Sequence, residues 1–163
     1  MSMGIWYEVM FRWVGPADKV MAMTKVNVPQ RQDYDGSWHT ITVPDHIDIL
    51  STLANGAQAH IRVSSVTGLS PGNEVWLYGT EGTIHLDQRM NVFGGKRGDS
   101  QLTEIPNPIE DQYAWHVEEE FIDSIREGTP VARTPFDVGV HYMEFSEAVT
   151  RSAQSGQSIS LPL

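Results

Sequence analysis

The chain has 163 residues, of which 21 are acidic and 11 basic, so its formal net charge is −10. This excess of negative charge repels phosphate backbones and anionic lipid surfaces, so we expect neither a nucleic acid nor a membrane as a partner. The sequence has no cysteine, which excludes disulfides, thiolate metal sites and a cysteine nucleophile. We expect one compact domain over residues 1–163, in a cytoplasmic protein.

The first part of the chain predicts one helix followed by a strand. Residues 4–14 form an amphipathic pattern that ends at Gly15-Pro16, and residues 19–28 alternate as a strand that ends at Pro29. Residues 29–45 are polar and rich in turn residues, which predicts a long loop, with a short strand possible at residues 40–43.

Two hairpins are predicted next. Residues 46–54 and 57–66 flank Asn55-Gly56, the preferred pair for a type I′ turn. The second hairpin surrounds Gly79-Thr80-Glu81-Gly82, where a phosphate-binding loop is the alternative. A phosphate loop leads into a helix, whereas residues 83–87 alternate as a strand, so a turn whose glycines supply positive φ is favoured.

Further short strands are predicted at residues 91–93 and 101–105, separated by a loop at residues 94–99. The last third is helical. One helix is predicted from Asn107-Pro108 to Gly128, with a buried apolar stripe. A second helix starts at Thr134-Pro135 and ends at Gly156, and a final strand follows. The residues of the first helix's stripe are Tyr113, Val117, Phe121, Ile122 and Ile125.

Strands first and helices later is an α+β pattern. The simplest arrangement is a largely antiparallel, open-faced sheet with helices packed on one face. This is the fold class that the sequence predicts.

The order of these motifs resembles the C-terminal domain of the Gfo/Idh/MocA family of NAD(P)-dependent sugar and inositol dehydrogenases. The resemblance is carried by GNEVWLYGTEGTIHLD, by FIDSIREGTP and by EAVTRSAQSGQSISLP, with a further hairpin around the N-G-A turn at residues 55–57. It implies an N-terminal Rossmann domain that binds NAD or NADP. The chain has no G-x-G-x-x-G motif, so we expect it to bind no cofactor itself.

The resemblance also implies that the first helix matches the family's catalytic helix, which usually reads G-x-H-x-x-D. Aligned through Gly4, the histidine position is occupied by Trp6 and the aspartate position by Val9. Neither side chain exchanges a proton at neutral pH. Tyr7 and Glu8 are weak catalytic candidates, because one residue along a helix turns a side chain by about 100°.

A contact surface is predicted on the polar face of the sheet. Aromatic side chains with arginine suit an interface, and the resemblance implies a homodimer through this face. Ligand binding and an ordinary half-solvated face are the alternatives. The candidate interface residues are Gln58, His60, Arg62, Trp76, Tyr78 and His85.

Other candidate sites are weaker. The six histidines include no His-x-x-x-His pair on a predicted helix, so no metal site is expected. Residues 33–39 begin like a calcium loop but lack its third acid and distal glutamate, which favours a polar loop. Consecutive acids at Glu118, Glu119 and Glu120 fan over a helix and predict a solvated face.

The sequence therefore predicts the substrate-binding and dimerisation domain of a sugar or polyol oxidoreductase, without its cofactor domain and inactive by itself. The alternative is a standalone, non-catalytic dimerising or ligand-binding module derived from that family, which Trp6 and Val9 favour. A hydrolase is a third possibility, but the chain lacks a G-x-S-x-G nucleophile elbow.

Overall fold

The computed structural model describes residues 2–108 and 116–163. Its internal contacts divide the chain into two compact units, which are described separately. Unit 1 contains residues 1–67 and 117–163, and unit 2 contains residues 68–116.

Unit 1 is built on an antiparallel sheet of order β10-β1-β4-β5. Its strands are β1 (Ala17–Lys25), β4 (His46–Leu53), β5 (Gln58–Ser64) and β10 (Ile159–Ser160). The C-terminal strand is shorter than predicted and pairs with the edge of β1. A separate small hairpin, β2 (Gln30–Gln32) with β3 (Trp38–Thr40), extends from the segment predicted as a loop.

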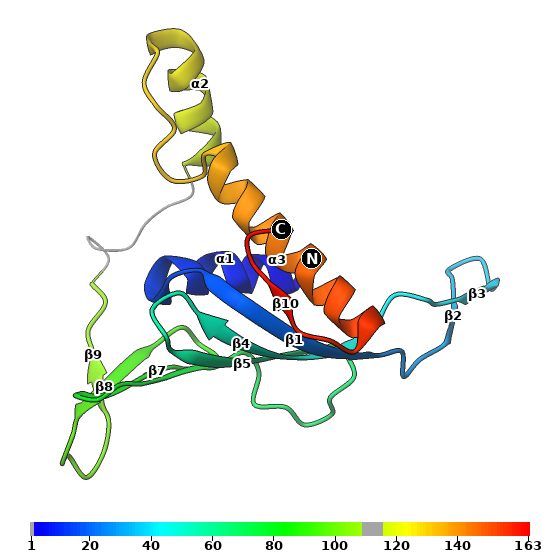
Figure 1. The fold of residues 1–163 in the computed structure, drawn as a ribbon, viewed down its shortest axis with the longest axis horizontal. Coiled ribbons are helices and arrows are strands. Elements are labelled where there is room, and N and C mark those ends of the chain that lie inside the picture. Colours follow the sequence, from blue (N-terminus) through cyan, green and yellow to red (C-terminus); the bar gives the residue numbers. More distant parts are fainter. Residues whose placement is uncertain (1, 109–115) are drawn as a thin grey trace. The chain divides into compact units, whose positions relative to one another are not determined.

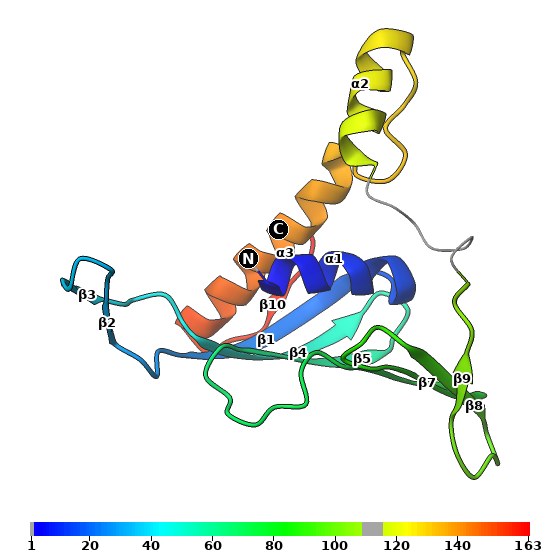
Figure 2. The same ribbon diagram turned by 180° about the vertical axis from the view of Figure 1, so that it is seen from behind.

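The helices α1 (Ser2–Val14) and α3 (Phe136–Ser155) lie on the same side of this sheet (Figures 1 and 2). Both end at the predicted glycines, Gly15 and Gly156, whose φ angles are 85° and 69°. The alternate residues of the strands that face the helices form the core. Its fully buried large side chains are Val20, Ile49, Phe145 and Val149. The α+β class, with helices on one face of an antiparallel sheet, is confirmed.

The turn between β4 and β5 differs from the predicted type I′ turn. Gly56 has a φ of 85°, but Asn55 does not have a positive φ. Gly56 N–H donates to Leu53 O at 2.8 Å, and Leu53 N–H donates to Ala57 O at 2.8 Å. These bonds define a three-residue loop in which a left-handed glycine follows an ordinary turn.

The helix α2 (Val117–Glu127) starts later than the predicted start at Asn107-Pro108, where the two residues are not helical. Tyr113, the first residue of the predicted apolar stripe, lies outside the described residues. The predicted buried stripe is also wrong for the described part of the helix. None of the residues of α2, all of which the structure describes, is buried. Phe121, Ile122 and Ile125 are 53%, 42% and 67% exposed.

Unit 2 is an antiparallel sheet of order β6-β7-β8-β9. It contains β6 (Val75–Tyr78), β7 (Gly82–Leu86), β8 (Val92–Lys96) and β9 (Thr103–Ile105). The predicted hairpin around Gly79 and Gly82 is present, but neither glycine has a positive φ. The loop predicted at residues 94–99 is partly wrong, since its first three residues continue β8.

Candidate functional site

The face of the unit 1 sheet that α1 and α3 leave uncovered is the open face. Side chains alternate along β4, so that Ile47, Ile49 and Leu53 pack with the core while Asp48 and Leu50 face the other way. The cross-strand register pairs Asp48 with Arg62 and Leu50 with His60, which brings these four residues onto the open face together.

Asp48 is the centre of a polar network on this face. Its Oδ1 accepts a hydrogen bond from Arg62 Nε at 2.9 Å and lies 3.2 Å from His60 Nε2. Its Oδ2 lies 2.9 Å from His46 Nε2. One carboxylate therefore holds a guanidinium and two imidazoles from two strands in a fixed arrangement.

The network lowers the pKa of Asp48 to about 2. The hydrogen bond from Arg62 is the largest cause, followed by the hydrogen bond from His46, and both favour the ionised carboxylate. Asp48 is thus an anion throughout the neutral range, and it orients the Arg62 guanidinium and the two imidazole rings around it.

Exposed apolar side chains surround the network. Met21, Met23 and Leu50 are 49%, 76% and 60% exposed, and β1 pairs Met21 with Leu50 and Met23 with Asp48. Methionine and arginine are enriched at protein interfaces. The open face therefore combines an apolar contact area with a preorganised charged group.

A shallow hollow of about 380 Å³ lies at the ends of β1 and β5 and at the start of β4. Lys25, His46 and Ser64 line it from neighbouring strands, and Asn27, Val66 and Thr67 complete it. The amide of Asn27 is already engaged, because its Nδ2 donates to Asp45 Oδ1 at 2.9 Å. His46 belongs both to this hollow and to the Asp48 network.

Trp76, Tyr78 and His85 lie together in unit 2. The Trp76 ring stacks on the His85 ring, with centroids 3.7 Å apart, and Tyr78 lies 6.0 Å from Trp76 in a nearly parallel plane. Trp76 Nε1 donates to Glu74 Oε2 at 3.3 Å. His85 Nε2 is buried and has no hydrogen-bond partner among the described residues; Glu74 Oε2 lies 3.7 Å away.

The six predicted interface residues therefore form two groups. Gln58, His60 and Arg62 lie on β5 in unit 1, and the aromatic group lies in unit 2. Their use as an interface stays a prediction. The sequence prediction missed Asp48, the residue that joins His60 and Arg62.

The residues at the expected catalytic positions lie on α1. Trp6 and Val9 are half-buried. Tyr7 is buried, its hydroxyl accepts a hydrogen bond from Ala17 N–H at 3.0 Å, and burial raises the pKa of this phenol. Glu8 Oε1 is paired with Arg12 Nη2 at 2.6 Å. Both weak candidates are thus engaged in contacts within unit 1.

The described residues do not form a dinucleotide site of the Rossmann type. All strand pairs in residues 2–108 and 116–163 are antiparallel, and the glycine turns described here join strands or end helices. A Rossmann site instead needs a parallel sheet and a glycine-rich turn that enters a helix.

The same part of the chain contains no group of three His, Asp or Glu side chains that could hold a metal ion. None of the described helices is long and apolar enough to cross a bilayer.

Comparison with solved structures identifies oxidoreductases of similar fold. An NAD binding oxidoreductase from Klebsiella pneumoniae superposes with a TM-score of 0.77 at 18% identity, covering 96% of this chain and 48% of that one. For levoglucosan dehydrogenase the TM-score is 0.79 at 18% identity, covering 98% and 50%.

The WlbA dehydrogenase from Bordetella pertussis, solved with NADH and UDP-GlcNAcA, gives a TM-score of 0.70 at 20% identity, covering 99% and 44%. The chain thus spans about half the length of these structures. No curated protein sequence matches it. A family model described as the GFO/IDH/MocA C-terminal domain matches residues 1–85, more than half of the chain, and the protein therefore belongs to the Gfo/Idh/MocA family.

Proposed function

We propose that this chain is the substrate-binding and dimerisation domain of an NAD(P)-dependent oxidoreductase that acts on a CH–OH group of a sugar or polyol. The proposed location is the cytoplasm, since a cysteine-free, acidic chain fits a reducing compartment. A sugar substrate is supported by two neighbours of similar fold, one solved with UDP-GlcNAcA and one with levoglucosan.

The observation that carries the proposal is the open face of unit 1. In a two-fold dimer the same surface of each subunit meets its copy, so a face that dimerises must complement itself. The Asp48 network offers an anion, Asp48, and a cation, Arg62, and exposed Met21, Met23 and Leu50 offer apolar area. Such a face can pair with its own copy through apolar contact and through charges of opposite sign.

The isolated chain is proposed to be inactive. Hydride transfer requires a bound nicotinamide, and the relatives are about twice as long as this chain. On α1, the family's histidine and aspartate positions hold Trp6 and Val9, which transfer no proton.

The same two residues favour a second candidate function, a standalone module that dimerises or binds a ligand without redox chemistry. Under this alternative the fold persists and α1 has lost the proton-transfer groups. The two candidate functions differ in whether a dinucleotide-binding domain acts together with this chain to catalyse a redox reaction.

Isothermal titration with NAD(H) and NADP(H), combined with light scattering in the same buffer, tests the proposal. We expect no nucleotide heat from a stable dimer, and we expect Leu50→Glu to convert the dimer to a monomer. Nucleotide binding in the micromolar range would contradict the proposal that this chain binds no cofactor by itself. A monomer at all concentrations would remove the dimerisation role.

A further inference from the structure

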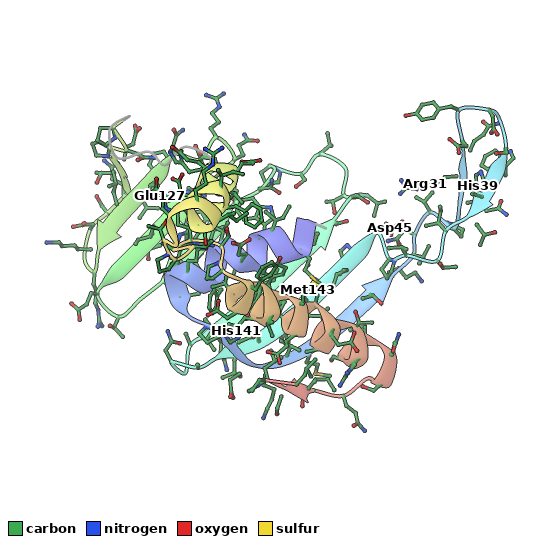
Figure 3. All side chains as sticks on the ribbon, turned by 90° about the horizontal axis from the view of Figure 1, so that it is seen from above. Arg31, His39, Asp45, Glu127, His141 and Met143 are labelled. Carbon is green, nitrogen blue, oxygen red and sulfur yellow. The ribbon has the colours of Figure 1, made fainter. Side chains whose placement is uncertain are left out.

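Two aromatic rings of unit 2 lie side by side on the strand β6. The rings of Trp76 and Tyr78 have planes inclined by 9° and centroids 6.0 Å apart. Residues two apart on a strand share a face and lie about 6.6 Å apart, so the two rings form neighbouring parts of one flat surface. The side chains are 43% and 77% exposed. These two rings form the aromatic shelf, and the strands of unit 2 are drawn in green in Figure 3.

One side of the shelf is covered by a histidine. The ring of His85, on the neighbouring strand β7, lies flat against the Trp76 ring at a centroid distance of 3.7 Å. The ring of Phe93, on β8, follows at 6.0 Å, so the stack continues into the sheet. The other face of Trp76 therefore points away from β7. Since β6 is the outermost strand of this sheet, that face is directed beyond the sheet edge.

The backbone at the same edge offers hydrogen-bonding groups. Gly79 N–H donates to Gly82 O at 2.8 Å, so these two residues form a hydrogen-bonded pair at the turn. The two kinds of pair alternate along an antiparallel ladder, which places Trp76 and Tyr78 in non-hydrogen-bonded positions opposite β7. Their N–H and C=O groups consequently point outward from the edge. Such positions also bring cross-strand side chains closest together, which fits the tight stack on Trp76.

A carboxylate lies beside the shelf. Trp76 Nε1 donates to Glu74 Oε2 at 3.3 Å, and the same oxygen lies 3.7 Å from the buried Nε2 of His85. No donor in residues 2–108 and 116–163 reaches the second oxygen, Oε1, and the Glu74 side chain is 31% exposed. Oε1 can therefore accept a hydrogen bond from a ligand that lies on the shelf.

These features fit a sugar ring. In a pyranose with equatorial hydroxyls the axial C–H bonds point to the two faces of the ring, and their partial positive charge is attracted to the negative face of an aromatic ring. Its hydroxyls both donate and accept hydrogen bonds, and the sheet edge offers acceptors and donors to them.

Other ligand classes fit less well. The Glu74 carboxylate and the net charge of −10 repel a nucleotide or another phosphate ligand. A compact cation is bound best inside a cage of aromatic rings, whereas these two rings are nearly coplanar. A second copy of the chain would bring Glu74 toward its own copy in a two-fold contact, which opposes association.

We propose that the aromatic shelf, Glu74 and the outward backbone groups of β6 form a binding site for saccharides made of equatorially substituted pyranoses. The sugar rings lie against the outer faces of Trp76 and Tyr78, and their hydroxyls bond to Glu74 Oε1 and to the sheet edge. The site lies within unit 2 and holds the saccharide without transforming it. It goes beyond the proposed function, because it requires neither a nicotinamide nor the dimer through unit 1.

Titration with cellotriose, a neutral and flat β-linked glucose trimer, tests the site. In a proton–nitrogen correlation spectrum of the isotope-labelled chain, we expect the indole N–H of Trp76 and the amides of residues 75–78 to shift and to saturate. Tyr78→Ala should weaken the affinity at least about tenfold, whereas Tyr78→Phe, which keeps the ring, should change it less than about twofold. Sorbitol, which has hydroxyls but no ring, should cause no saturable shift.

Two control variants separate the site from the fold and from the dimer. Tyr34 is 107% exposed in the small hairpin of unit 1, so Tyr34→Ala should leave the affinity for cellotriose unchanged. Leu50→Glu, the variant expected to break the dimer, should bind cellotriose as the wild type does. Loss of the dimer and loss of saccharide binding are therefore separate results.

Three results would overturn the proposal. The first is the absence of a saturable shift at about 20 mM cellotriose, a concentration at which even a site of millimolar affinity is largely filled. The second is full affinity in Tyr78→Ala. The third is a shift of the Trp76 signal that follows the concentration of the chain alone, which would assign the shelf to a second copy.

Discussion

The ring of Tyr7 lies flat against the ring of Phe145, with centroids 3.6 Å apart and planes inclined by 4°. Phe145 is fully buried in α3 and Tyr7 is 4% exposed in α1, so the pair fastens the two helices to each other above the sheet. The Tyr7 hydroxyl extends from the stack to Ala17 N–H at the start of β1. One side chain therefore joins a helix, its neighbour and the first strand.

Tyr7→Phe should destabilise unit 1 by about 1–3 kcal/mol, because the buried Ala17 N–H loses its acceptor while the stack remains. Urea unfolding monitored by circular dichroism measures the change. Tyr142→Phe is the matched control, since its hydroxyl makes no hydrogen bond to the described residues, and it should cost less than about 0.5 kcal/mol. Equal effects from the two variants would mean that the Ala17 bond contributes nothing.

Ser152→Ala should cost about 1–3 kcal/mol for a similar reason. The strand β10 covers β1 only at Lys19 and Val20, so the Ala22 N–H beyond it is satisfied by Ser152 Oγ at 2.9 Å. The same hydroxyl donates to Gln157 O at 2.6 Å.

Thermal unfolding of Ser152→Ala and Thr150→Ala compares two hydroxyls of one helix. Thr150 is exposed and bonds only within α3, to Ser146 O at 2.9 Å, so its removal should be nearly neutral. A wild-type melting temperature for Ser152→Ala would show that water can replace the lost hydroxyl at the sheet edge.

The sequence predicts the main elements of unit 1 well, because its signals are local. Glycines at the ends of α1 and α3 and the alternating apolar residues of β4 and β5 determine helix ends and strand faces without tertiary information. The apolar residues of α2 carry an equally strong pattern, yet they are exposed. Periodicity predicts which apolar residues share one side of a helix, but it does not show whether other described residues cover that side.

The candidate site was harder to predict, because it depends on strand register. A two-residue turn at Asn55-Gly56 would place Asp48 opposite Val63, whereas the observed three-residue loop places it opposite Arg62. A slip of one residue moves every side chain to the other face, so an error in turn type hides the network. The equal spacing of Asp48 and Arg62 from a three-residue loop that ends at Gly56 is the sequence signal that indicates their pairing.

Asp48 should make stability depend on acid pH. The native pKa of its carboxyl, about 2, lies below the ordinary value of 3.8, so its contribution is complete above pH 3.8 and disappears as the pH falls toward 2. Since the side chain is 35% exposed, solvent screening limits this contribution to about 1 kcal/mol or less.

Asp48→Asn should therefore lower the urea midpoint at pH 7 and match the wild type near pH 2. Asp123→Asn is the control, because Asp123 pairs with no cation in residues 2–108 and 116–163, and it should leave the pH profile unchanged. A wild-type profile for Asp48→Asn would mean that the network adds nothing to folding.

Gly82 is required by close strand packing, which differs from the conformational freedom expected of it. It does not adopt a positive φ, but a Cβ at this position would collide with the carbonyl oxygen of Gly95 on β8. Gly82→Ala should therefore push β7 and β8 apart and cost about 1–3 kcal/mol. At Gly79 an added Cβ would meet only Gly82 O, at an ordinary 3.4 Å.

The pair Gly82→Ala and Gly79→Ala tests this reading by hydrogen exchange of β7 and β8. The Gly82→Ala variant should accelerate exchange of the backbone amides around the position where Gly82 pairs with Lys96, and the Gly79→Ala variant should change their exchange little. Because the strain is confined to unit 2, the amides of β4 and β5 serve as an internal reference. Equal exchange in both variants would mean that the strands adjust to a methyl group, and that these glycines are required for another reason.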